Sequence, residues 1–95
     1  EGAEVLTGGG PANLNSGLEK GYYIQPTILK GHNRMRVFQE EIFGPVVSVS
    51  TFKTTEEAIE VANDTLYGLG AGFWTHVAHE LYQMPRAMQA ARVWV

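Results

Sequence analysis

The sequence predicts an α/β fold: a partial open sheet of mostly parallel strands joined by crossover helices. Apolar residues make up 44% of the 95 residues and charged residues 18%, the balance of a globular chain rather than a disordered one. From residue 46 to residue 95, strand and helix patterns alternate, which is typical of a parallel sheet with right-handed crossovers. The length allows one small domain or part of a larger one. We therefore expect residues 1–95 to form a single partial domain.

The first half of the chain predicts three strands and one turn of helix. Residues 3–7 are compatible with a strand that stops at a Gly-Gly-Gly-Pro sequence. Residues 22–29 are rich in aromatic and β-branched side chains, although Pro26 implies an edge position or a break in that strand. Residues 34–39 fit a single helical turn. Pro45 then forces an extended conformation on the residue before it, and a strand follows over residues 46–52.

The second half predicts two helices between strands. Thr54 with Glu57 three residues later forms a capping box, which predicts a helix over residues 55–64. Its expected buried stripe is Ala58, Ile59, Ala62 and Leu66. After a short strand over residues 71–75, apolar residues recur at spacings of four and three and predict a second helix, kinked at Pro85. They are Val77, Leu81, Met84, Met88 and Ala91. Residues 92–95 complete the pattern as a last strand.

Composition excludes several classes of function. Seven basic residues against ten acidic ones give a net charge of −3 without a basic cluster, so neither nucleic acid nor membrane is an expected partner. No apolar run approaches the length that spans a bilayer, and no N-terminal export signal is recognisable, so the expected location is the cytoplasm. The chain has no cysteine, which excludes a disulfide, a thiolate metal site and a cysteine nucleophile within these residues.

The segment Glu40-Glu41-Ile42-Phe43-Gly44-Pro45-Val46-Val47 carries the clearest functional signal. It holds an acidic pair and an aromatic ring at a Gly-Pro bend where an apolar strand begins. An ionised carboxylate can accept hydrogen bonds from two neighbouring hydroxyls while a ring packs on the apolar side of a sugar, so the pair suits a ribose. The alternative is that Glu41 caps a turn and Phe43 fills the core. Glu40 is the less favoured carboxylate, expected to be solvated or ion-paired.

This segment resembles the aldehyde dehydrogenase superfamily. The resemblance continues through residues 21–27 (GYYIQPT), 63–69 (NDTLYGL) and 93–95 (VWV), in the order and spacing of that family's catalytic domain. Within the family, the sequence most resembles the branch acting on short aliphatic aldehydes. It implies oxidation of aldehydes to carboxylic acids with NAD or NADP, through a cysteine thiolate that lies outside these residues. It also implies that Glu41 binds the hydroxyls of the nicotinamide ribose and that Phe43 packs on the ribose or nicotinamide.

The resemblance sets expectations for the chain as a whole. Val95 stops inside a predicted strand and Glu1 is not a methionine, so we expect a fragment truncated at both ends. Within it we expect no catalytic residue, no metal ligand, no tight cofactor binding and no turnover by the isolated polypeptide. The alternative function is an inactive module that folds or self-associates. A half-covered sheet with free edges predicts a homo-oligomer in either case.

Three other motifs are less favoured as sites. The triple glycine at residues 8–10 could hold a phosphate but lacks the spacing of a nucleotide fingerprint. His76 and His79 lie three residues apart without a complete metal-ligand set, and solvent-facing histidines are the better interpretation. Five aromatic residues could form a stacking platform, but no basic residues are interleaved and we expect them to pack in the core. They are Tyr22, Tyr23, Tyr67, Trp74 and Trp94.

Overall fold

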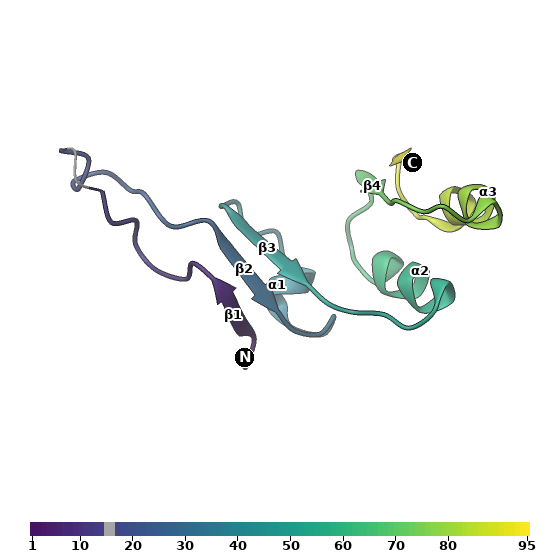
Figure 1. Cartoon of the computed structure of the whole chain (residues 1–95), viewed down its shortest axis with the longest axis horizontal. Coiled ribbons are helices and arrows are strands. Elements are labelled where there is room, and N and C mark those ends of the chain that lie inside the picture. Colours follow the sequence, from purple (N-terminus) through teal and green to yellow (C-terminus); the bar gives the residue numbers. More distant parts are fainter. Residues whose placement is uncertain (15–16) are drawn as a thin grey trace. The chain divides into compact units, whose positions relative to one another are not determined.

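The computed structural model describes residues 1–14 and 17–95. These residues form two compact units, Glu1–Ser50 and Thr51–Val95, and together they have the mixed α/β character that the sequence predicts (Figure 1). Within the described ranges, no helix is long and apolar enough to cross a bilayer.

The first unit is built on a three-stranded sheet in the order β1-β2-β3. Strands β2 (Thr27–Lys30) and β3 (Val46–Val49) are parallel, and helix α1 (Arg36–Gln39) lies on the connection between them. Strand β1 (Glu4–Thr7) adds antiparallel to β2, with an irregularity in register between its residues 5 and 7. The predicted strands and the helical turn are therefore present, although β3 is shorter than the sequence pattern predicts.

Pro26 breaks the second predicted strand. A proline has no amide hydrogen to donate to a ladder, so β2 begins at the next residue, Thr27. The Thr27 amide donates to the Pro45 carbonyl at 2.8 Å, which joins the start of β2 to the loop that enters β3. Of the two predicted alternatives, the structure shows the break, and β2 is the middle strand of the sheet.

The triple glycine allows two segments to approach closely. Gly8 has a φ of 74°, and a Cβ there would lie 2.2 Å from the Pro26 carbonyl oxygen. The next amide, that of Gly9, donates to the hydroxyl of the buried Thr27 at 2.8 Å. Because that amide is used inside the fold, the segment has a structural role, and one of its three glycine amides is not available to a phosphate.

The second unit contains a parallel strand pair with a helix between the strands. Strand β4 (Gly70–Gly72) is parallel to β5 (Arg92–Trp94), and helix α3 (Ala78–Ala87) connects them, as the alternating pattern predicts. However, β3 pairs with β2 and β4 pairs with β5, so the strands form two sheets rather than one continuous sheet over residues 46–95. The connections through α1 and α3 each return the chain beside the strand it left. Hydrophobic patterns do not specify which strands become neighbours.

Helix α2 (Thr55–Asn63) begins where the capping box predicts. The Thr54 hydroxyl accepts from the Glu57 amide at 3.2 Å, while the Glu57 carboxylate accepts from the Lys53 amide at 2.7 Å. The carboxylate thus reaches one residue beyond the amide that a standard capping box uses. Both hydrogen bonds satisfy donors at the helix start, which has no earlier carbonyls to pair with.

Two side chains tie α3 to the rest of its unit. Glu80, in the first turn of α3, accepts hydrogen bonds from the hydroxyl of Thr55 at 2.7 Å and from the hydroxyl of Thr75. These bonds, first Thr75 and then Thr55, lower the pKa of Glu80. At the other end, the Asn63 side-chain amide donates to the Ala87 carbonyl at 2.8 Å. Polar contacts therefore hold both ends of the two helices together.

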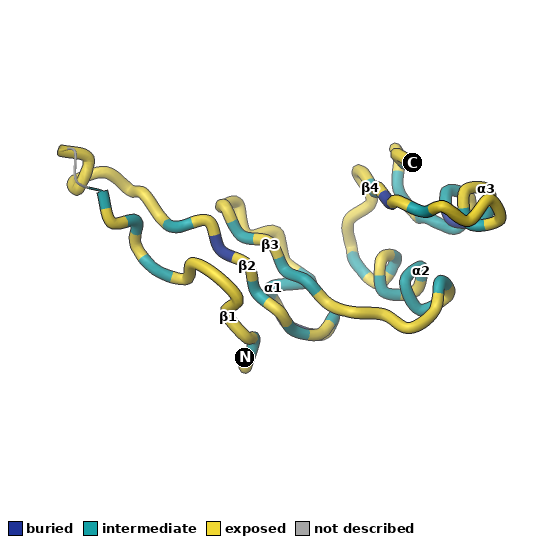
Figure 2. Tube along the Cα trace, in the orientation of Figure 1, coloured by how far each residue is buried: buried dark blue, intermediate teal, exposed yellow. Residues whose placement is uncertain are grey.

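The core of each unit is small (Figure 2). Among residues 1–14 and 17–95, the buried apolar side chains are Met35, Phe73 and Met84. All five aromatic residues that the sequence assigns to a core are half or more exposed, Trp74 at 94%, and Leu66 at the end of the α2 stripe is 99% exposed. The core assignment is wrong for these residues, because an apolar face is buried only where another layer covers it, and the described elements supply too few layers.

We expect the Glu80 contacts to make the second unit sensitive to acid. A carboxylate whose pKa is lowered in the folded state stabilises the fold above its ordinary value of 4.5, and this contribution is lost as pH falls through the lowered pKa. Urea unfolding followed by tryptophan fluorescence, between about pH 7 and pH 3, should show a larger fall in midpoint for the unchanged chain than for Glu80→Gln. Glu60→Gln, at an exposed site on α2, is the control. Identical pH profiles for Glu80→Gln and the unchanged chain would contradict this role.

Candidate functional site

The candidate site begins at α1, a single helical turn that is anchored to the sheet connection. The residue before it, Met35, is buried, and its sulfur would be 2.5 Å from a Cβ placed at Gly31. Glycine therefore lets Met35 pack against the backbone that leaves β2. The Glu40 amide donates to the Arg36 carbonyl at 2.8 Å, and Glu40 itself is extended, which ends the helix.

Glu40 forms an ion pair within this turn. The guanidinium of Arg36 donates to both carboxylate oxygens, at 2.9 Å from Nε and 2.8 Å from Nη2. This contact lowers the pKa of Glu40 and raises the pKa of Arg36. Both side chains are exposed, so the pair contributes little to stability. Both oxygens of the Glu40 carboxylate nevertheless have Arg36 as a hydrogen-bond partner. The prediction that Glu40 is ion-paired is confirmed.

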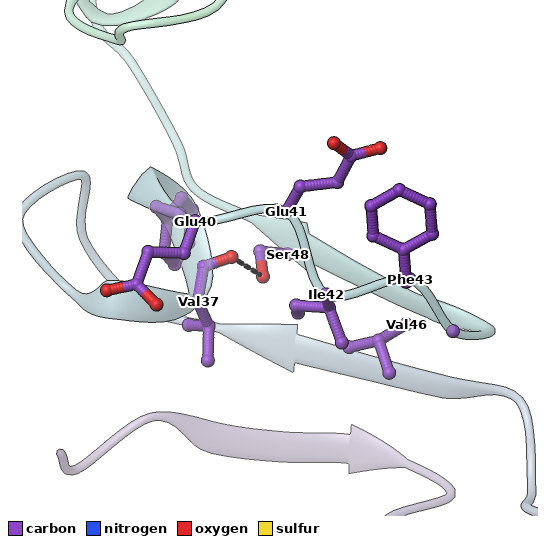
Figure 3. Close-up of a pocket in the computed structure, with 9 residues that line it drawn as sticks. Val37, Glu40, Glu41, Ile42, Phe43, Val46 and Ser48 are labelled. Carbon is purple, nitrogen blue, oxygen red and sulfur yellow. Dashed lines mark hydrogen bonds between the residues drawn. The ribbon is translucent and has the colours of Figure 1, made fainter.

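Glu41 and Phe43 follow at alternate positions and extend to the same side of the chain (Figure 3). The Phe43 ring is 89% exposed, so it does not fill the core of this unit. Phe43 also has a φ of 53°, and within the described ranges it is the one residue other than glycine in the left-handed region. That conformation costs an L-residue about 1 kcal/mol or more. The chain therefore presents the exposed ring of Phe43 from a strained backbone conformation, beside the carboxylate of Glu41.

Gly44 and Pro45 shape the entry into β3. The Val46 amide donates to the Gly44 carbonyl at 2.8 Å, which makes a tight bend across the proline. The Pro45 carbonyl accepts from the Thr27 amide, so the bend is also tied to β2. These contacts give Gly44 and Pro45 a structural role in the bend.

A hollow of about 380 Å³ adjoins the acidic and aromatic residues (Figure 3). Its lining comes from α1, the loop and β3, and consists of Val37, Phe38, Glu40, Glu41, Ile42, Phe43, Gly44, Val46 and Ser48. Ser48 donates a hydrogen bond from its hydroxyl to the Val37 carbonyl at 2.8 Å. Sequence reasoning missed Ser48. Its one signal is a single hydroxyl in the apolar run of β3.

The other candidate motifs do not assemble a site. His76 and His79 are both exposed, as expected, and within residues 1–14 and 17–95 no group of three or more histidine or carboxylate side chains could hold a metal ion. The loop between α1 and β3 is therefore the remaining candidate for a binding site.

The fold and this loop define a class: an α/β protein with an acidic and an aromatic side chain presented together at the mouth of a parallel strand. The model of the aldehyde dehydrogenase family matches residues 1–95, and the chain belongs to this family. It is 65% identical over 94 residues to an aldehyde dehydrogenase of Paracoccus denitrificans and 63% identical to an acetaldehyde dehydrogenase of Pseudomonas aeruginosa. In each case the match covers 99% of this chain, but only 18% and 19% of the relative.

Solved structures give the same result. The chain matches the indole-3-acetaldehyde dehydrogenase of P. syringae in complex with NAD+ and IAA, with a TM-score of 0.88, 48% identity and coverage of 99% of this chain. It matches an aldehyde dehydrogenase of Mycobacterium tuberculosis complexed with NAD+ with a TM-score of 0.86, 36% identity and coverage of 98%. The chain spans about a fifth of the length of these proteins.

The strain at Phe43 can be measured with two truncations of the ring. Phe43→Gly and Phe43→Ala both remove an exposed side chain, but only glycine adopts a positive φ without a Cβ penalty. We expect the free energy of unfolding to be up to about 1 kcal/mol higher for the glycine variant than for the alanine variant. Exchange of the Thr27 amide hydrogen, which is bonded to Pro45, reports on this unit. Equal or slower exchange in Phe43→Ala would contradict the strained conformation.

Proposed function

We propose that this chain is the part of an NAD-dependent aldehyde dehydrogenase that holds the nicotinamide ribose, in an enzyme that oxidises aldehydes to carboxylic acids. The observation that carries the proposal is the joint presentation of Glu41 and Phe43 on one side of the loop between α1 and β3. Family membership and the NAD+ complexes of related structures support it. Residues 1–95 are then one portion of a single catalytic domain.

The two side chains fit complementary parts of the cofactor. The Glu41 carboxylate can accept hydrogen bonds from the two neighbouring ribose hydroxyls, and the Phe43 ring offers an apolar face to the sugar or the nicotinamide. The bound cofactor supplies the hydride acceptor, and these residues orient it. Glu40 is engaged in its ion pair with Arg36, and the resemblance to the family assigns this role to Glu41.

The chain supplies one wall of such a site. It contains no cysteine, so the thiolate nucleophile of the proposed enzyme comes from residues outside this sequence. The isolated chain is therefore not expected to oxidise aldehydes or to bind NAD tightly.

The substrate is an aldehyde whose chain length this segment does not specify. Relatives that are 61–63% identical carry names for acetaldehyde, long-chain aldehyde and fluoroacetaldehyde dehydrogenases. Similar segments thus accompany different substrates. We therefore propose aldehyde oxidation in general, because the similarity of this segment does not distinguish among these substrates.

A chimeric enzyme tests the role of Glu41. This chain would replace the matching 94-residue segment of the Paracoccus denitrificans relative, and NADH formation from an aldehyde would be measured. Glu41→Gln removes the charge that strengthens two hydrogen bonds, so we expect the KM for NAD to rise about tenfold or more. An unchanged KM, or a folded chimera without turnover, would contradict the proposed function.

Glu40→Gln is the matched control for that experiment. It makes the same chemical change one residue away, on a carboxylate engaged by Arg36. We expect the KM for NAD to stay within about twofold, because a surface ion pair of this kind contributes little. The isolated chain, assayed in parallel, should form no NADH.

A second proposed function is self-association of the chain when it occurs alone. Its apolar side chains are exposed over both units, among them Tyr22, Leu66, Leu69 and Trp74. Contiguous exposed apolar surface and unpaired strand edges favour association with another copy. We expect sedimentation of the purified chain to give a mass that is a multiple of 10.5 kDa and that rises with concentration. A monomer at high concentration would contradict this.

A further inference from the structure

Ser48 links the two elements between which the candidate cofactor loop is held. Its hydroxyl lies on β3 and donates to the Val37 carbonyl on α1 at 2.8 Å, across eleven residues of sequence (Figure 3). The bond is partly buried, and Ser48 lines the same hollow as Glu41 and Phe43.

The Val37 carbonyl needs such a partner. A helix leaves its last four carbonyls without an intrahelical donor, and α1 is only four residues long. The Glu40 amide satisfies the Arg36 carbonyl, which is one residue earlier. The Ser48 hydroxyl serves the next carbonyl, and in doing so it joins the end of α1 to the strand.

The loop depends on how its two ends are placed. On one side the chain leaves α1 after the hydrogen bond from Glu40 to Arg36, and on the other it enters β3 at the bend between Gly44 and Val46. Residues 41–43 lie between these points, and their orientation follows from the relative positions of helix and strand. The hydrogen bond from Ser48 to Val37 restricts movement of the helix relative to the strand.

We propose that Ser48 is a positioning residue that sets the orientation of Glu41 and Phe43 toward the cofactor without touching it. This inference rests on the proposed function of Glu41. Binding groups need placement within about 0.5 Å to act together, and a loop with a strained residue at its centre has no regular structure of its own to provide it. Loss of the Ser48 bond therefore weakens cofactor binding through the loop.

Two substitutions of similar shape isolate the hydroxyl. Ser48→Thr keeps the hydroxyl donor and adds one methyl group, whereas Ser48→Val has the same branched shape as threonine with a methyl group in place of the hydroxyl. In the chimeric enzyme described above, we expect Ser48→Val to raise the KM for NAD about fivefold to tenfold, because that is the change in affinity that the loss of one hydrogen bond produces. The KM for the aldehyde should stay unchanged. Ser48→Thr should stay within about twofold of the parent.

A double substitution separates positioning from a general loss of structure. If Ser48 acts through the carboxylate, Ser48→Val should add little to the effect of Glu41→Gln, because coupled residues give non-additive changes. Equal KM values for NAD in Ser48→Thr and Ser48→Val, or fully additive effects with Glu41→Gln, would overturn the inference. If Ser48→Val does not fold, the same comparison is made between Ser48→Ala and Ser48→Thr.

The outcomes also distinguish this inference from the function on which it rests. A raised KM for NAD in Glu41→Gln, with no difference between the Ser48 variants, overturns the positioning role alone. An unchanged KM in Glu41→Gln overturns the proposed function and the inference together, even if Ser48→Val has an effect, since the hydroxyl would then act on another group.

Discussion

The first unit depends on Thr27 more than on any apolar contact. Its amide donates to the Pro45 carbonyl, and its hydroxyl accepts from the Gly9 amide and donates to the Gln25 carbonyl at 2.9 Å. One buried residue thus joins the loop after β1, the start of β2 and the bend that enters β3. Because Pro26 and Pro45 cannot donate and Gly8 leaves no room for a side chain, this network has few alternative arrangements. The hydrogen bonds of Thr27 therefore help to place the candidate loop between α1 and β3.

Polar contacts also help to hold the second unit together. Glu80 and Asn63 join α2 to α3 at opposite ends, while Phe73 and Met84 are its buried apolar side chains among the residues the structure describes. A unit of this size cannot bury enough apolar surface to offset the conformational entropy of its chain with a wide margin. This explains why hydrogen bonds between helices carry structural weight here, and why so many apolar side chains remain exposed.

The candidate site combines local strain with support from its neighbours. Phe43 holds a left-handed conformation that a glycine would adopt more easily, and its ring gains almost no burial in return. Strained, exposed residues persist when the surrounding structure determines their conformation, and they are concentrated at functional sites. The bend at Gly44 and Pro45 and the hydroxyl of Ser48 are the local supports. Together they present Glu41 and Phe43 in one direction.

The sequence alone determined where most elements lie and which segment is the candidate site. Capping residues, prolines and apolar spacing act within a few residues, so the start of α2 at Thr55, the break at Pro26 and the strand after Pro45 were all predictable. Family membership could also be read from four short motifs. Only the tertiary structure decided which strands pair, which aromatic side chains stay exposed, that Phe43 has a positive φ and that Ser48 reaches Val37. These features depend on contacts between residues far apart in the chain, and local patterns do not encode such contacts.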